Sequence, residues 1–128
     1  MKLRVEQSGN VTVIHVESNH LDAGNTTQFR NAMSEAIAGR QAVLIDLTDV
    51  QFVDSSGLGA LLSCLRQISA DGGRLRLCGI SRTVRSLFEL VRMHRVFEIH
   101  GSREEALAAF ASERNDDEGA APPPEEAP

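Results

Sequence analysis

Two serines and an aspartate stand together near the middle of the chain, where they could carry chemistry. The segment reads Asp54-Ser55-Ser56-Gly57. Apolar side chains then recur every three or four residues, as they do on one face of a helix: Leu58, Leu61, Leu62, Leu65 and Ile68. Asp and Ser are favoured just before the first helical turn, because their oxygens accept hydrogen bonds from free backbone N–H groups. The sequence therefore predicts a carboxylate and a hydroxyl at the N-terminus of a helix.

This position leaves three interpretations of Ser55 and Ser56. The first is an ordinary helix cap. The second is a nucleophile, which needs an adjacent base; all four histidines are remote in sequence, and the G-x-S-x-G elbow is absent. The third is phosphorylation, since a phosphate adds nearly two negative charges and is well placed at a helix N-terminus. We expect no catalytic residue, so the cap and the phosphorylation site remain.

Asp22 and Asp54 each follow a predicted strand and precede a predicted helix. In a parallel sheet such loops gather beyond the carboxyl ends of the strands, so we expect the two carboxylates to lie at the same end of the domain. They could act as an acid–base pair or simply as a loop residue and a cap. Two carboxylates without a histidine or further acids make a weak metal site, so we expect no metal.

Nucleotide-binding loops are also absent. The only lysine is Lys2, and Gly57-Leu58-Gly59 lacks the third glycine of a dinucleotide fingerprint. We expect no cofactor, so any ATP has to come with another protein. Each glycine costs about 1 kcal/mol relative to alanine inside a helix. Gly57 and Gly59 therefore suggest that either the sheet or an outside partner approaches the backbone closely.

The elements that position these residues follow from periodicity and turn signals. Strands are expected at 3–7, 11–16, 42–47, 75–78 and 96–99. Helices are expected from about 23 or 26 to 38, at 56–70, at 82–91 and from 103 onward. The first two strands form a hairpin through Ser8-Gly9-Asn10, and strands then alternate with helices. This order predicts an α/β domain, a small mixed and mostly parallel sheet of about five strands flanked by about four helices.

Charge divides the chain into two parts. Residues 1–111 hold 12 Lys and Arg against 12 Asp and Glu, whereas residues 112–128 hold six acids and one arginine. The second part is polar and ends in Pro-Pro-Pro-Glu-Glu-Ala-Pro, a composition that cannot bury a core. We therefore expect a domain over 1–111 and a disordered acidic tail over 112–128.

Composition excludes several classes of partner. The chain has no Trp or Tyr and no basic patch, so nucleic-acid binding is not expected. No apolar run reaches about 18 residues, and the N-terminus lacks a signal-peptide pattern, so no membrane association is expected. Cys64 and Cys78 fit small buried hydrophobes in a reducing compartment. We expect a cytoplasmic protein.

Taken together, these motifs resemble a known family. Asp54-Ser55-Ser56-Gly57-Leu58-Gly59, after the strand at 43–47, is similar to the signature of STAS domains and, more narrowly, of bacterial anti-sigma factor antagonists. Leu21-Asp22, Gly72-Gly73 and the segment 84–88 match the same pattern. The resemblance covers about residues 3–111 and implies the STAS fold.

The resemblance also implies a role for each residue of the motif. It implies that Ser55 is phosphorylated, with Ser56 as the second candidate, and that Asp22 and the turn 54–57 meet a GHKL-type serine kinase that is also an anti-sigma factor. In such a family the unphosphorylated form binds that partner and frees a sigma factor, and a metal-dependent serine phosphatase reverses phosphorylation. We expect the less bulky side of the helix, at Gly59, Ala60, Ser63 and Cys64, to extend the contact. We expect the protein to be a monomer or weak dimer. The alternative is a non-switching STAS subunit of a transporter or sensory complex.

Overall fold

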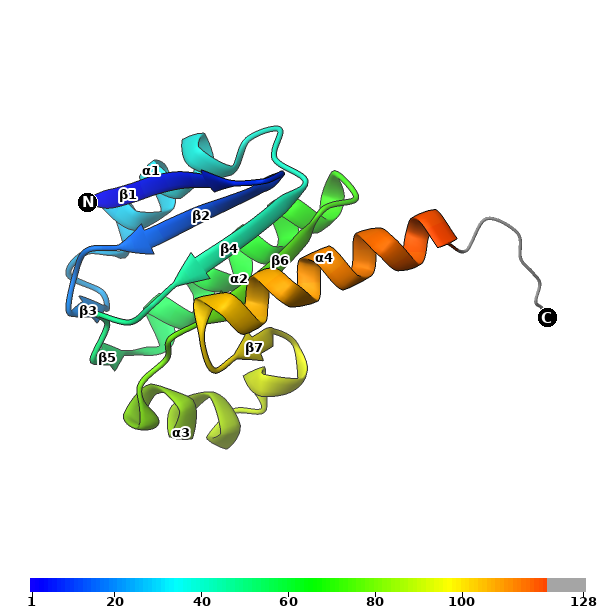
Figure 1. Ribbon diagram of the computed structural model, residues 1–128. Helices are drawn as coiled ribbons and strands as arrows, with labels where there is room; N and C mark the ends of the chain where they lie inside the picture. The colour runs from blue at the N-terminus through cyan, green and yellow to red at the C-terminus, as the bar shows by residue number, and fades with distance from the viewer. Residues whose placement is uncertain (120–128) are drawn as a thin grey trace.

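A five-stranded sheet forms the centre of the domain, with helices on both faces (Figure 1). The computed structural model describes the backbone of residues 1–119 and the side chains of residues 1–113. Its elements in chain order are β1 (Leu3–Ser8), β2 (Val11–Val16), β3 (His20–Leu21), α1 (Thr26–Ile37), β4 (Ala42–Asp46), β5 (Phe52–Val53), α2 (Ser55–Ala70), β6 (Arg74–Cys78), α3 (Arg82–Leu90), the 3-10 turn η1 (Met93–Arg95), β7 (Glu98–His100) and α4 (Arg103–Gly119).

The strands of the main sheet lie in the order β1-β2-β4-β6-β7. β1 runs antiparallel to β2, and the other three pairs of neighbours are parallel. Parallel neighbours need a crossover connection, and the helices between the strands supply it. The predicted hairpin and the predicted mixed, mostly parallel α/β sheet are confirmed.

The two faces of the sheet are covered unequally. The larger apolar core lies on the face covered by α1, α2 and α3, and includes Phe29, Leu61 and Phe88. A smaller cluster, which includes Leu44 and Phe110, lies under α4 on the other face. Figure 1 shows α4 crossing this face alone, in front of β4 and β6. One helix cannot cover five strands, and charged side chains of the sheet, Arg76 and Glu98, lie beside α4 on this face.

Two helices begin at the caps that the sequence predicts. The Ser81 hydroxyl accepts a hydrogen bond from the Val84 amide at 3.2 Å, and the Ser102 hydroxyl accepts one from the Glu105 amide at 3.1 Å. The Glu105 carboxylate accepts from the Gly101 amide, one residue before the cap. Both helix starts are thus fixed by local hydrogen bonds, as capping requires.

The last helix differs from the expectation. The predicted boundary at residue 111 falls inside α4, which continues to Gly119. Its extension is anchored, because the Arg76 guanidinium lies 5.0 Å from the centre of the Phe110 ring, and Glu113 pairs with Arg74 at 3.0 Å and Arg76 at 2.9 Å. Residues 120–128 of the predicted tail lie outside the described residues.

A second, two-stranded sheet is absent from the expectation. β3 and β5 pair in parallel, with His20 opposite Phe52 and Leu21 opposite Val53. Two residues give too short a pattern to predict a strand. This small sheet brings the loop after β3 beside the turn before α2.

Candidate functional site

The carboxylate of Asp54 joins the two loops that the sequence predicts to meet. Asp54 is the N-cap of α2, and its carboxylate accepts hydrogen bonds from the Gly57 amide at 3.0 Å and the Ala23 amide at 3.1 Å. These donors, the Gly57 amide first, hold the pKa of Asp54 below its ordinary value. The prediction that the Asp22 loop and the Asp54 turn lie at the same end of the domain is confirmed.

The Asp22 loop is held by its own short-range bonds. The Asp22 carboxylate accepts from the Gly24 amide at 2.9 Å, and the Asn25 side chain accepts from the Asp22 amide at 3.0 Å. His20 Nε2 lies 3.8 Å from an Asp22 oxygen. The loop therefore presents a half-buried carboxylate in a defined position next to the start of α2.

The serines differ in exposure. Ser55 is the first residue of α2 and is exposed, whereas Ser56 is half-buried. In residues 1–113 neither hydroxyl makes a side-chain hydrogen bond, and no histidine bonds to them; His15 bonds to Asp49 and His20 to Asn19. The geometry gives the nucleophile interpretation no base, and it leaves the Ser55 hydroxyl open to an approaching protein.

Gly57 and Gly59 have different reasons to be glycine. A Cβ atom on Gly57 would lie 2.3 Å from the Leu21 carbonyl oxygen and 2.9 Å from a Val53 methyl, so α2 packs directly on β3 there. A Cβ atom on Gly59 would meet only the Arg30 guanidinium, at 3.3 Å. The sequence predicts that either the sheet or an outside partner approaches the backbone at these glycines, and at Gly57 it is the sheet.

The predicted contact surface is narrower than the sequence suggested. Gly57 is buried, and Ala60 has 0% exposure. A buried side chain cannot touch a partner, so the predicted direct contacts through Ala60 and Cys64, which is 4% exposed, are wrong. Both side chains lie on the inward face of α2. Gly59 and Ser63 are half-exposed and stay predicted contacts.

Sequence reasoning missed an apolar feature beside the serines. Phe52, three residues before Ser55, is 53% exposed. It borders a hollow of about 190 Å³ between β5 and α3, which is also lined by Val53, Thr83, Val84 and Leu87. The sequence around Phe52 carries no pattern long enough to predict this feature, and only the position of α3 shows that Phe52 stays uncovered.

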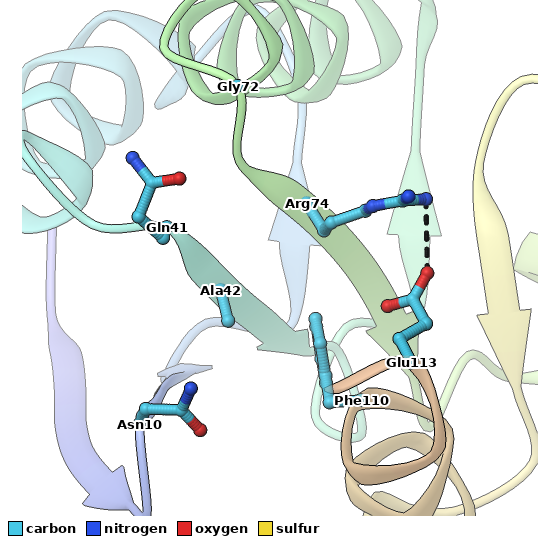
Figure 2. A pocket seen from close by; sticks show the side chains of 7 residues that line it. All are labelled: Asn10, Gln41, Ala42, Gly72, Arg74, Phe110 and Glu113. Atoms are coloured by element: carbon cyan, nitrogen blue, oxygen red, sulfur yellow. Dashed lines mark ion pairs between the residues drawn. The ribbon is translucent and has the colours of Figure 1, made fainter. Parts of the chain in front are cut away.

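A larger hollow of about 270 Å³ lies at the opposite end of the sheet (Figure 2). It opens between the first residues of β4 and β6 and the C-terminal half of α4. Figure 2 shows the Arg74 guanidinium turned toward Glu113, with which it forms an ion pair. The two charges that line the hollow thus neutralise each other, and the hollow is remote from the carboxyl ends of the strands. Size alone does not identify the functional site here.

Neither metal coordination nor a membrane span is evident in the described part of the chain. Among those residues no group of three His, Cys, Asp or Glu side chains is placed to hold a metal ion. None of the helices there has the combined length and apolar character that crossing a bilayer requires.

Comparison with known proteins gives a consistent result. The family model of the STAS domain matches residues 2–106. The chain is 31% identical to an anti-sigma F factor antagonist of Paenibacillus polymyxa over 110 residues, which are 84% of this chain and 94% of that protein. It is 30% identical to a putative anti-sigma factor antagonist, BtrV, of Bordetella bronchiseptica over 91 residues, 70% of this chain and 78% of that one.

Solved structures share the fold. An anti-sigma-factor antagonist (STAS) domain protein from Planctomyces limnophilus superposes with a TM-score of 0.79 at 29% identity, covering 85% of this chain and 97% of that one. The Bacillus cell fate determinant SpoIIAA, solved in its phosphorylated form, superposes with a TM-score of 0.63 at 27% identity, covering 85% and 99%.

Proposed function

This chain belongs to the STAS domain family, among the anti-sigma factor antagonists, and from that premise we propose that phosphorylation of Ser55 switches its binding to an anti-sigma factor. The unphosphorylated form binds a GHKL-type serine kinase that restrains a sigma factor, and the sigma factor is released. The kinase then phosphorylates Ser55 and ends the binding, and a metal-dependent serine phosphatase restores it. This exchange takes place in the cytoplasm, where sigma factors act.

One observation carries this proposal: the Ser55 hydroxyl is exposed at the first residue of α2, beside a cap that is already fixed. A phosphate there meets the positive end of the helix dipole. Asp54 holds the turn through the Gly57 and Ala23 amides, so the new group requires no rearrangement of the backbone. Phosphorylation is therefore expected to change the surface and leave the fold unchanged.

The effect on binding follows from charge. Asp22 and Asp54 already place two carboxylates beside Ser55, and a phosphate adds about two further negative charges. An interface that has adapted to the unmodified turn then contains like charges without water to screen them. Like charges in an interface cost several kcal/mol, which corresponds to about a hundredfold or more in affinity.

The proposed footprint combines this switch with an apolar anchor. It includes Asp22, Asp54, Ser55, Ser56 and the half-exposed side of α2 at Gly59. The Phe52 hollow adds a buried aromatic contact of the kind that contributes most to interface energy. The polar turn then governs when binding occurs, and the apolar hollow supplies much of its strength.

Binding of the cognate kinase to variants of this chain tests the proposal. We expect Ser55→Ala to bind as wild type does without being phosphorylated. Ser55→Asp should bind at least tenfold more weakly, a smaller loss than phosphorylation gives, because aspartate carries one negative charge and phosphoserine about two. Ser69→Asp adds the same charge to an exposed position at the other end of α2 and should bind normally. Ser56→Ala should still accept phosphate, which phosphopeptide mass spectrometry locates.

Equal affinity of Ser55→Asp and Ser55→Ala for the kinase would show that the switch is wrong. Recovery of the protein in a stable membrane or sensory complex, with no phosphoserine in cells, would favour the non-switching subunit instead.

A further inference from the structure

The first strand forms an open edge of the main sheet. β1 is outermost in the strand order, and β2 is the only strand that it pairs with in the described chain (Figure 1). All its residues after Leu3 are exposed, and Val5 is 48% exposed. An edge of six residues with an apolar side chain at its centre is a template for pairing with another strand.

The direction of the backbone groups follows from one hydrogen bond. The Glu17 amide donates to the Lys2 carbonyl at 3.0 Å, so these two residues form a hydrogen-bonded pair at the end of the β1–β2 ladder. Hydrogen-bonded and non-hydrogen-bonded pairs alternate along an antiparallel ladder. Arg4 and Glu6 therefore direct their N–H and C=O groups toward β2. Those of Leu3, Val5 and Gln7 point outward, away from the sheet.

The charges on β1 are complementary to those of a second copy in one register. Outward residues must face outward residues for the new ladder to form, which allows only shifts of two residues. With Val5 opposite Val5 of the second copy, Arg4 lies opposite Glu6 twice. A shift of two residues either way sets Arg4 against Arg4 or Glu6 against Glu6. Opposite charges directly across an antiparallel pair are favourable, and like charges are unfavourable.

We infer that a second copy of this chain pairs antiparallel with β1, about a twofold axis at Val5, and joins the two sheets into one. Arg4 and Glu6 also pair within the chain, with each other at 3.5 Å and with Glu17 and Arg103, both at 2.7 Å. Their side chains keep 50% and 43% of their exposure, so each has room for a partner across the axis. The interface is small, below about 1,000 Å², which makes the dimer weak and concentration-dependent.

The geometry leaves both switch sites free. Ser55 lies beyond the carboxyl ends of the parallel strands, and a twofold axis through β1 reverses the strand direction in the second copy. The two serines would then lie at opposite ends of the continuous sheet, each open to its own partner. This dimer does not depend on the proposed function, because it uses the edge of the sheet and not the serine turn.

Sedimentation equilibrium of the full chain from about 10 µM to about 1 mM tests the inference, a range suited to weak association. Wild type should dimerise reversibly. Arg4→Glu and Glu6→Arg should each weaken the dimer about tenfold or more, because both cross-strand pairs become repulsive. An equimolar mixture of the two variants should dimerise again, because each residue 4 then faces an opposite charge at residue 6.

Two further variants separate pairing from folding. Val5→Pro removes an amide that points away from β2, so it should abolish the dimer and keep the wild-type circular dichroism spectrum. Glu104→Arg changes the charge on exposed α4, off the edge, and should dimerise as wild type does. A monomeric wild type throughout the range, a dimer that survives Val5→Pro, or a mixture no more dimeric than its components would each overturn the inference.

Discussion

Replacing each of the two glycines at the start of α2 by alanine should change stability in opposite directions. At Gly57 the added methyl group would lie 2.3 Å from the Leu21 carbonyl oxygen and 2.9 Å from a Val53 methyl. The Leu21 carbonyl cannot retreat easily, because it accepts a hydrogen bond from the Asp54 amide and belongs to β3. The start of α2 must therefore move away from the small sheet, by roughly 1 Å if atoms are to regain ordinary contact distance.

The magnitude follows from two opposing effects. Overpacking of this kind costs about 1–3 kcal/mol, and contact with backbone atoms places Gly57 at the upper end. Better helix propensity returns up to about 1 kcal/mol. We expect Gly57→Ala to lose about 2 kcal/mol. At Gly59 the neighbour is the end of the flexible Arg30 side chain, so the propensity gain remains and Gly59→Ala should gain about 0.5–1 kcal/mol.

Thermal unfolding followed by circular dichroism measures both effects. For a domain of this size 1 kcal/mol corresponds to about 4 °C in Tm. Gly57→Ala should thus unfold about 8 °C below wild type, and Gly59→Ala about 2–4 °C above it. The reasoning is refuted if Gly57→Ala is as stable as wild type, which would mean that α2 does not rest on β3 as described. It is also refuted if Gly59→Ala is less stable, which would mean that the Arg30 side chain does not make room for the methyl group.

Three further predictions concern the carboxylates. Asp54→Ala should lower Tm and increase amide hydrogen exchange at both Gly57 and Ala23, whereas Asp54→Ser should keep the Gly57 protection, since serine also caps helices. Burial would raise the pKa of Asp46, but hydrogen bonds from Thr48, together with the His15 ring 3.3 Å away, outweigh burial, and the pKa lies below its ordinary value. Stability from Asp46 is then present at neutral pH and lost as the pH falls below about 4. Urea unfolding between about pH 6 and 3 should show a shallower acid loss for Asp46→Asn than for wild type. Glu113→Ala leaves the Arg76 guanidinium with one carboxylate partner fewer, and the free energy of unfolding measured in urea should fall by about 1–2 kcal/mol. An unchanged free energy of unfolding would mean that the chain packs only to residue 111.

The sequence by itself determined the features that depend on local patterns of residues, namely the helices, the strands and the helix starts. The strands and helices follow from apolar periodicity, and the starts of α2, α3 and α4 follow from Asp54, Ser81 and Ser102, whose oxygens bond to amides three residues on. Such signals lie within one turn of chain, so a single sequence contains them in full. The serine motif and its place at a helix N-terminus are of this kind, and so is the family.

Contacts between segments distant in sequence decided which side chains at the site are buried or exposed and how far α4 extends. Position 57 has to be glycine because Leu21 and Val53 of the small sheet lie directly against it. The same packing buries Ala60, whereas Phe52 stays exposed beside α3. These partners lie tens of residues apart, and no local pattern states which side of a helix will meet them. The length of α4 has the same origin: residues 112–119 look too polar to fold, but Glu113 finds Arg74 and Arg76 only after the sheet has formed.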